Sequence, residues 1–177
     1  MLKSPEDLWK MAIQELKRSN EDVKHPFRQM VFGTIGLYPD TRTVIKRKID
    51  ERLHILFYSD SRAQKVVQLK NNPNSSIIFY HPGKMLQIRM QGKTKIHSDG
   101  SLFDTHFKIA CQNSGDYISK KGPGEPIGDG SKGNKMHFCL LEFVPEKMDI
   151  LLLQKAGHIR AAYETKDGWR HGVLLTP

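Results

Sequence analysis

The sequence predicts a mainly β protein with peripheral α-helices, arranged as an antiparallel barrel of six or seven strands. From residue 29 onward, short runs rich in Val, Ile, Phe and Tyr are separated by turn residues, a pattern typical of strands. Strands and helices do not alternate as in βαβ units, so an antiparallel barrel is favoured over a parallel sheet. A chain of 177 residues can bury its own core, so we expect one domain over residues 1–177.

The first 20 residues are predicted to form a helix that packs on the barrel. Ser4 is a suitable N-cap, and Pro5 occupies the first helical position. Leu8 and further apolar residues then follow at helical spacing, so the helix is predicted over residues 5–18.

The remaining elements follow from apolar runs and turn residues. A short helix is predicted between Asp60 and Lys70, capped by Asp60 or Ser61, and another over residues 101–112. Asp167 and Gly168 predict a hairpin turn. The predicted strands cover residues 30–37, 42–49, 53–59, 75–80, 86–97, 138–144, 147–154, 159–163 and 169–174.

Residues 120–134 form a Gly- and Pro-rich segment that we expect to be a flexible surface loop. The segment lacks Gly-Lys-Ser/Thr, and its two prolines lack the N–H donors that a phosphate cradle needs. A flexible loop is therefore favoured over a nucleotide loop, and a lid over a ligand is one role open to it.

Composition narrows the possible partners and compartments. The net charge is +9, but Lys and Arg are scattered along the chain, which favours small phosphorylated ligands over nucleic acid. No apolar run approaches the roughly 20 residues that span a bilayer, so no membrane partner is expected. The N-terminus has no apolar segment typical of a secretory signal, so we expect a cytoplasmic protein.

Metal chemistry is not indicated. The eight histidines form neither His-Glu-x-x-His nor a tight His/Asp/Glu cluster in the sequence. Cys111 and Cys139 do not form a Cys-x-x-Cys pair. We therefore expect no metal site.

A set of cations lies near the ends of predicted strands and at the start of the short helix. A helix N-terminus with nearby Arg and Lys is a ready anion site, because unpaired backbone N–H groups and positive charge act together. Exposed cations are also common at strand and helix ends, which is the alternative explanation. The cations are Arg42, Arg47, Arg62, Lys65 and Arg160.

The order and separation of these motifs resemble the pyridoxamine 5′-phosphate oxidase family, whose members hold FMN by its phosphate in a split β-barrel. The resemblance extends over about residues 28–177. The motifs that carry it are Arg42-Thr43-Val44-Ile45, Tyr58-Ser59-Asp60-Ser61-Arg62-Ala63-Gln64-Lys65, Asn71-Asn72-Pro73 and Gln87-Ile88-Arg89-Met90-Gln91-Gly92.

The resemblance implies an FMN site and assigns residues to it. Lys65 matches the lysine that binds phosphate, while Gln64 stands where many members have arginine, a charge that Arg62 could supply. Gln87 matches a glutamine that hydrogen-bonds the flavin ring, and Arg160 matches an arginine near the C-terminus. The remaining expected cofactor-binding residues are Arg42 at the phosphate or ribityl chain, Thr43 and Val44 near the isoalloxazine edge, the aromatic–hydroxyl pair Tyr58 and Ser59, and Arg47 at the place of the family's substrate lysine.

The substrate positions depart from the family pattern. Ile150 replaces the flavin-contacting tryptophan, and Ala156-Gly157-His158 keeps only the histidine of the Arg-x-His motif. The family's phosphate clamp of tyrosine, arginine and serine is replaced by Asp104, Lys108 and Gln112. We therefore expect a protein that keeps FMN but does not act on pyridoxamine phosphate.

The expected function is that of an FMN-dependent oxidoreductase acting on an unknown small-molecule substrate or reductant. The resemblance implies a homodimer with FMN between the subunits. His158 is the candidate general base by position, although a structural histidine fits equally. A non-enzymatic flavin- or haem-type binding protein on the same barrel is the alternative, and a deazaflavin in place of FMN stays open.

Overall fold

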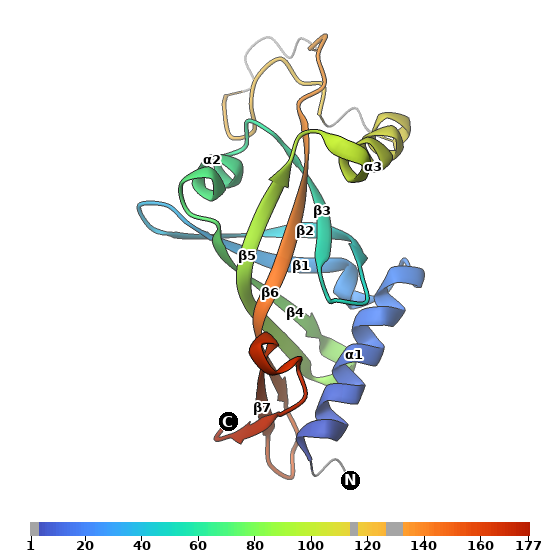
Figure 1. Ribbon diagram of the computed structural model, residues 1–177, viewed down its shortest axis with the longest axis vertical. Helices are drawn as coiled ribbons and strands as arrows, with labels where there is room; N and C mark the ends of the chain where they lie inside the picture. The colour runs from blue at the N-terminus through green and yellow to red at the C-terminus, as the bar shows by residue number, and fades with distance from the viewer. Residues whose placement is uncertain (1–3, 114–116, 127–132) are drawn as a thin grey trace.

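A computed structural model describes residues 4–113, 117–126 and 133–177 (Figure 1). Its strands form one antiparallel sheet in the order β3-β2-β1-β4-β5-β6-β7-β8, and β6 also pairs with β3. This pairing closes β1 to β6 into a six-stranded barrel, which confirms the predicted fold class. The barrel strands are β1 (Gln29–Ile35), β2 (Pro39–Ile49), β3 (Ile55–Asp60), β4 (Asn74–His81), β5 (Leu86–His97) and β6 (Phe138–Leu152).

β6 is one long strand, although the sequence predicts two. Pro145 reads as a break, but Gln91 pairs with Lys147 and Gly92 with Pro145, so Glu146 is an extra residue in a bulge. Only glycine fits opposite this bulge, because a Cβ at Gly92 would lie 2.1 Å from the carbonyl oxygen of Val144. The bulge lets β6 leave the barrel and pair with β7 (Ile159–Glu164), which in turn pairs with β8 (Val173–Leu175).

The strand predicted over residues 169–174 begins later than expected. Gly168 and Trp169 both have positive φ angles, of 67° and 65°, so the chain turns here and cannot continue an extended strand. Pairing resumes at Val173. The short 3₁₀ helix η3 (Thr165–Asp167) precedes the turn.

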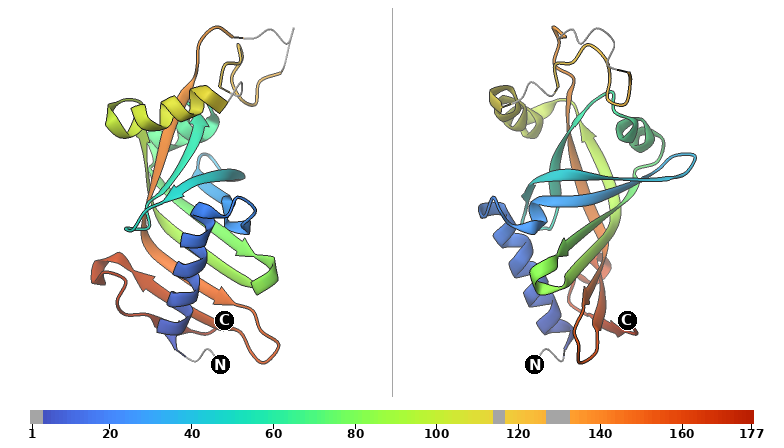
Figure 2. Two further views of the ribbon diagram at one scale, coloured as in Figure 1. Left: turned by 90° about the vertical axis from the view of Figure 1, so that its right-hand side faces the viewer. Right: turned by 180° about the vertical axis from the view of Figure 1, so that it is seen from behind.

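The described residues form three α-helices outside the barrel: α1 (Pro5–Glu21), α2 (Gln64–Asn71) and α3 (Gly100–Asn113). The predicted cap of α1 is confirmed, since the Asp7 amide donates to Ser4 Oγ at 3.2 Å. The helix is a turn longer than predicted, and Leu8, Ala12 and Leu16 are fully buried in the core. α1 runs along the outside of the barrel from the end that holds both termini, whereas α2 and α3 lie at the opposite end (Figures 1 and 2).

Aromatic side chains fill the barrel, while a smaller cluster lies beneath α3. Phe32 and Phe57 meet with ring centroids 4.9 Å apart, and Phe27 and Phe79 with centroids 5.2 Å apart. The smaller cluster packs Phe138 against α3. In the described part of the chain, no helix has the length and apolar character needed to cross a membrane. Of the predicted flexible loop over 120–134, residues 127–132 lie outside the described residues.

Candidate functional site

Two cationic side chains approach each other where β3 ends and α2 begins. The Lys65 ammonium donates to the Ser59 hydroxyl at 3.4 Å, and Ser59 is buried. Burial lowers the pKa of Lys65, and the positive charge of Arg42 lowers it further, while Cys139, Asp60 and Asp40 act in the opposite direction. A bound anion would relieve the repulsion between Lys65 and Arg42, so the geometry suits a phosphate.

Arg42 reaches this group from β2 and is held in a fixed orientation. Its guanidinium donates to Thr34 Oγ1 at 2.6 Å and to the Phe32 carbonyl at 3.3 Å. It also donates to Gln68 Oε1 at 3.3 Å and forms an ion pair with Asp40. Since Nε makes none of these bonds, one donor of the planar guanidinium remains for a ligand.

The N-terminus of α2 adds backbone donors to this group. The predicted side-chain cap is wrong, because Ala63 is the N-cap and forms no side-chain cap bond. Asp60 instead accepts from the Arg62 amide at 2.8 Å. The first amides of a helix have no intrahelical partner, so those of Gln64 and Lys65 lie where an anion would be bound. The Gln64 side chain itself is exposed.

Arg62 is directed at a loop. Its guanidinium pairs with Asp60 at 2.7 Å, and this hydrogen bond raises the pKa of Arg62. It also donates to the carbonyls of Ser119 and Lys120 at 3.1 and 3.2 Å. Arg62 therefore ties the chain after α3 to the end of β3, and its suggested contact with a phosphate stays a prediction.

Tyr58 and Ser59, the expected aromatic–hydroxyl pair, point to opposite sides of β3. Ser59 faces α2, whereas the Tyr58 hydroxyl lies 2.8 Å from Nδ1 of His106 on α3. The Arg47 guanidinium lies 4.6 Å from the centroid of the Tyr58 ring. Burial raises the pKa of Tyr58, partly offset by Arg47. Thr43 on β2 is exposed, whereas its neighbour Val44 packs on the core.

His106 is a residue that sequence reasoning missed. Burial lowers the pKa of its imidazole, and the charge of Lys48 adds to this effect. His106 is therefore poised as a neutral base beside Tyr58. The sequence does carry a signal for it, because His106 lies at helical spacing from Phe103 and Ala110, which with Phe107 form the face of α3 that packs on the barrel.

Gln87 and Arg160 lie apart from the Arg42 group. Gln87 on β5 pairs with Leu151 on β6, and Leu151 pairs with Arg160 on β7, so Gln87 and Arg160 lie in the same row of the sheet. Paired residues lead from Arg42 on β2 through β1 and β4 to Met90 on β5, so Arg42 and Met90 are three interstrand spacings apart, about 14 Å along the sheet. Gln87 lies three residues before Met90, about 10 Å along β5. Because side chains alternate along a strand and Met90 is buried, Gln87 points outward, whereas Arg42 points toward α2. One chain thus brings together only part of the expected flavin site.

Arg160 is anchored on this outer face by Asp149. Arg160 donates to the Asp149 carboxylate at 2.7 and 3.1 Å, and Arg89 pairs with the same carboxylate at 2.8 Å. The hydrogen bond that Arg160 donates to Asp149 raises the pKa of Arg160. His158 is exposed, and its Nδ1 accepts from the Gln154 amide at 3.2 Å, so it lies near this face and not near Tyr58.

The substituted family positions fall into two groups. Ile150 is fully buried between Ile88 and Ala161, so it is a core residue. The residues at the clamp positions on α3 are all exposed; these are Asp104, Lys108 and Gln112.

A cavity of about 350 Å³ adjoins Arg42 through its partners Thr34 and Asp40. The volume is at the lower end of the range that holds small-molecule ligands, about 300–1,000 Å³. Its wall is more apolar than polar, and several hydroxyl and amide groups are set into it. The lining includes Gly33, Thr34, Asp40, Thr41, Ser76 and Gln91.

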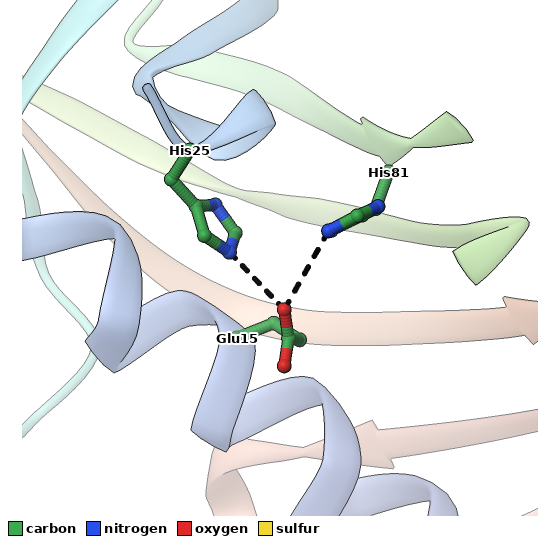
Figure 3. A group of neighbouring side chains, drawn as sticks. All are labelled: Glu15, His25 and His81. Carbon is green, nitrogen blue, oxygen red and sulfur yellow. Dashed lines mark hydrogen bonds and ion pairs between the residues drawn. The ribbon is translucent and has the colours of Figure 1, made fainter. Parts of the chain in front are cut away.

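A second group of ligand-type side chains joins α1 to the barrel (Figure 3). Glu15, His25 and His81 place one potential ligand atom each within 4.8 Å of one another, a cluster that the sequence did not indicate. His25 Nδ1 accepts from the Phe27 amide at 3.1 Å, and His81 Nδ1 accepts from the Lys84 amide at 3.2 Å. Each neutral ring therefore carries its proton on Nε2 and donates it toward Glu15, so neither Nε2 has a lone pair for a metal.

Comparison with known proteins relates the chain to one family. The family model described as pyridoxamine 5′-phosphate oxidase, FMN-binding domain, matches residues 6–98. A pyridoxine/pyridoxamine 5′-phosphate oxidase from Legionella pneumophila is 29% identical over 94 residues, which cover 52% of this chain but only 38% of the Legionella protein. Pyridoxine/pyridoxamine 5′-phosphate oxidase 2 from Arabidopsis thaliana is 25% identical over 166 residues, covering 82% of this chain and 83% of that protein.

Solved structures agree with this relationship. A pyridoxamine 5′-phosphate oxidase-related, FMN-binding protein from Nostoc punctiforme superposes with a TM-score of 0.74 and 25% identity over the full length of both chains. PhzG from Burkholderia lata, solved with tetrahydrophenazine-1-carboxylic acid, has a TM-score of 0.74 and 15% identity, covering 99% of this chain and 94% of PhzG. The PhzG likeness supports the fold alone.

Proposed function

The chain belongs to the pyridoxamine 5′-phosphate oxidase family of FMN-binding domains, and from this premise we propose that it is an FMN-dependent oxidoreductase. The observation that carries the proposal is the convergence of Arg42, Ser59 and Lys65 at the N-terminus of α2. Two cations, a hydroxyl and free backbone amides provide what a phosphate monoester requires. A bound flavin would supply hydride acceptance, and the protein would supply its orientation.

We propose that the complete site forms between two copies of the chain. Gln87 and Arg160 point to the outer face of the sheet, whereas Arg42 points toward α2 on its other side. The outer barrel face also exposes large apolar side chains, which a second copy would cover: Val31, Ile35, Ile45 and Tyr80 are each 40–47% exposed. A symmetric homodimer would set the Gln87 face of one copy against the Arg42 group of the other.

We propose that the substrate is not pyridoxamine phosphate. Asp104 places a carboxylate where the family has a phosphate-binding tyrosine, and Asp104, Lys108 and Gln112 are exposed on α3. On the side of β3 that faces α3, Arg47 instead lies over the Tyr58 ring, and the Tyr58 hydroxyl is hydrogen-bonded to His106. In addition to His158, His106 is therefore a second candidate for the general base that accepts a proton from the substrate. Bleaching of the flavin by pyridoxamine phosphate under anaerobic conditions would contradict this proposal.

The test compares FMN affinity between two lysine variants of α2. Lys65→Gln should weaken FMN binding about ten- to a hundred-fold, since a charge-assisted phosphate bond contributes roughly 1.5–3 kcal/mol. Lys70→Gln removes the same charge from an exposed position of the same helix and should leave the affinity unchanged. Equal FMN affinities in the two variants would show that Lys65 does not bind the FMN phosphate. Bound flavin that no donor reduces would identify a flavin carrier, and a Soret absorption would identify a haem-type protein.

A further inference from the structure

A second cavity, of about 380 Å³, lies between the first turns of α1 and the chain that follows η3. The elements that line it, the first turns of α1 and the chain after η3, lie toward the end of the molecule that holds both termini, away from α2 and α3 (Figure 1). We call it the aromatic pocket. Its side-chain walls are three aromatic rings and three charged groups, namely Trp9, Tyr163, Trp169, Glu6, Lys10 and Arg170.

The rings of the aromatic pocket pack against one another, with Trp9 between Tyr163 and Trp169. The Trp9 ring centroid lies 4.9 Å from that of Tyr163 and 5.8 Å from that of Trp169, and the two indoles are inclined by only 28°. Tyr163 is buried, whereas both indoles remain partly exposed to the cavity side. Trp169 is held against Trp9 by a left-handed backbone, a conformation that is costly for a large side chain.

The rim of the aromatic pocket carries net positive charge. Lys10 and Arg170 are both cationic, and neither forms an ion pair with a residue in the described ranges 4–113, 117–126 and 133–177. Glu6 is the one acidic side chain of the lining, so the charges sum to one positive unit at neutral pH. An anion entering the pocket would therefore be attracted, and Lys10 and Arg170 can donate to it.

The aromatic pocket is distinct from the proposed flavin site. The Arg42 group lies beside α2, at the other end of the molecule (Figure 1). Tyr163 and Arg160 are three residues apart on β7, so their side chains point to opposite faces of the strand. Tyr163 faces α1, where its hydroxyl donates to the Pro5 carbonyl, whereas Arg160 faces Asp149 on the outer face.

We propose that the aromatic pocket binds a planar aromatic anion, with the ring against the indoles and the acid group between Lys10 and Arg170. Offset or edge contacts with Trp and Tyr favour a flat aromatic ligand. The unpaired cations select its charge. The cavity volume falls within the range of small-molecule sites. This inference does not depend on flavin binding.

Trp9 and Trp169 are the two tryptophans of the chain, so tryptophan fluorescence reports on this pocket directly. The probes are 2-aminobenzoate and its uncharged match 2-aminobenzamide, both of which accept energy from tryptophan. With the full-length protein, we expect saturable energy transfer to 2-aminobenzoate. Its affinity should be at least about tenfold higher than that of the amide, as one charge-assisted bond provides. Transfer that does not saturate, or equal affinities for the two probes, would overturn the proposal.

Variants that remove positive charges distinguish binding in the aromatic pocket from non-specific attraction of an anion to a basic protein. The double variant Lys10→Gln/Arg170→Gln should bring the two probe affinities to within about twofold of each other. The control Lys24→Gln/Lys155→Gln removes two exposed cations outside the pocket and should keep the preference for 2-aminobenzoate. If both double variants lose the preference equally, the binding is non-specific and the assignment is wrong. If only the control variant loses the preference for 2-aminobenzoate, Lys10 and Arg170 are not the cations that bind the acid group, and the proposal is wrong.

Discussion

The Lys65 ammonium lies 3.4 Å from the Ser59 hydroxyl, close enough to Arg42 for the two positive charges to repel. Burial, together with this repulsion, lowers the pKa of Lys65 below that of a free lysine, and the negative charge of an FMN phosphate would oppose the shift. At alkaline pH, binding must then take up a proton, so FMN affinity should fall as the pH rises through the lowered pKa of Lys65. Riboflavin, which has no phosphate, should lack this dependence. Parallel affinity profiles for FMN and riboflavin between pH 7 and about 10 would argue against a Lys65–phosphate contact.

Subunit mixing tests the shared flavin site. Lys65→Gln and Arg160→Gln should each reduce FMN binding, since each damages both sites of a homodimer. In mixed dimers, one site carries both substitutions and the other carries neither. After unfolding and refolding an equal mixture, about one quarter of all sites should therefore bind FMN with native affinity. No recovery would mean that each site is built within one chain, and flavin fluorescence titration distinguishes the two cases.

Lys46 provides a test of stability against pH. This fully buried lysine on β2 donates to the Ser19 carbonyl at 3.2 Å and to Asn20 Oδ1 at 2.9 Å, at the C-terminus of α1. Burial lowers its pKa to about 8, and the nearby charge of Arg28 adds to the effect. Between pH 8 and the unfolded value near 10.5, the unfolded chain binds more protons, so stability from this group should rise with pH by about 1–3 kcal/mol.

Lys46→Met should abolish that rise and leave the free energy of unfolding at pH 7 unchanged or higher, because it removes a buried charge. Lys48→Met, at an exposed position on the same strand, should keep the rise. Urea unfolding at pH 7 and pH 9.5 gives both quantities. A loss of more than about 2 kcal/mol in Lys46→Met at pH 7 would show that its hydrogen bonds outweigh its burial.

The Glu15 cluster predicts acid sensitivity (Figure 3). Burial lowers the pKa of His81 below 6.5, although Glu15 opposes the shift, so the unfolded chain binds the proton more readily. The pKa of Glu15 is lowered below 4.5, because hydrogen bonds from Lys84 and His25 together exceed the opposing effect of burial. Stability should therefore fall below pH 6.5 as His81 is protonated, and again below pH 4.5 as Glu15 is protonated.

His81→Asn retains an acceptor for the Lys84 amide but cannot titrate, so it should reduce the loss between pH 7 and pH 5. Glu15→Gln should cost about 3 kcal/mol at pH 7, because it leaves the Lys84 ammonium and two imidazoles without their carboxylate. Guanidinium unfolding at pH 7, 6 and 5 measures both effects. A His81→Asn profile identical to that of the parent would assign the acid sensitivity to other groups.

The local sequence pattern was sufficient to predict regular strands and helices. It was not sufficient for features that depend on contacts between residues far apart in the sequence. The bounds of β5 were predicted correctly because its first ten residues alternate regularly between buried and outward positions. β6 was predicted as two strands, because a bulge opposite Gly92 depends on the partner strand and not on local sequence. His106 was missed because its contact with Tyr58 joins residues 48 apart and exists only once α3 packs on the barrel. The Glu15 cluster was missed for the same reason.

The proposed FMN site is tested most directly by the absorbance spectrum of the purified protein, followed by identification of the chromophore released on denaturation. We predict a yellow protein that releases FMN at about one molecule per chain, with the Arg42, Ser59 and Lys65 group holding its phosphate. A colourless protein that also fails to take up added FMN would contradict it.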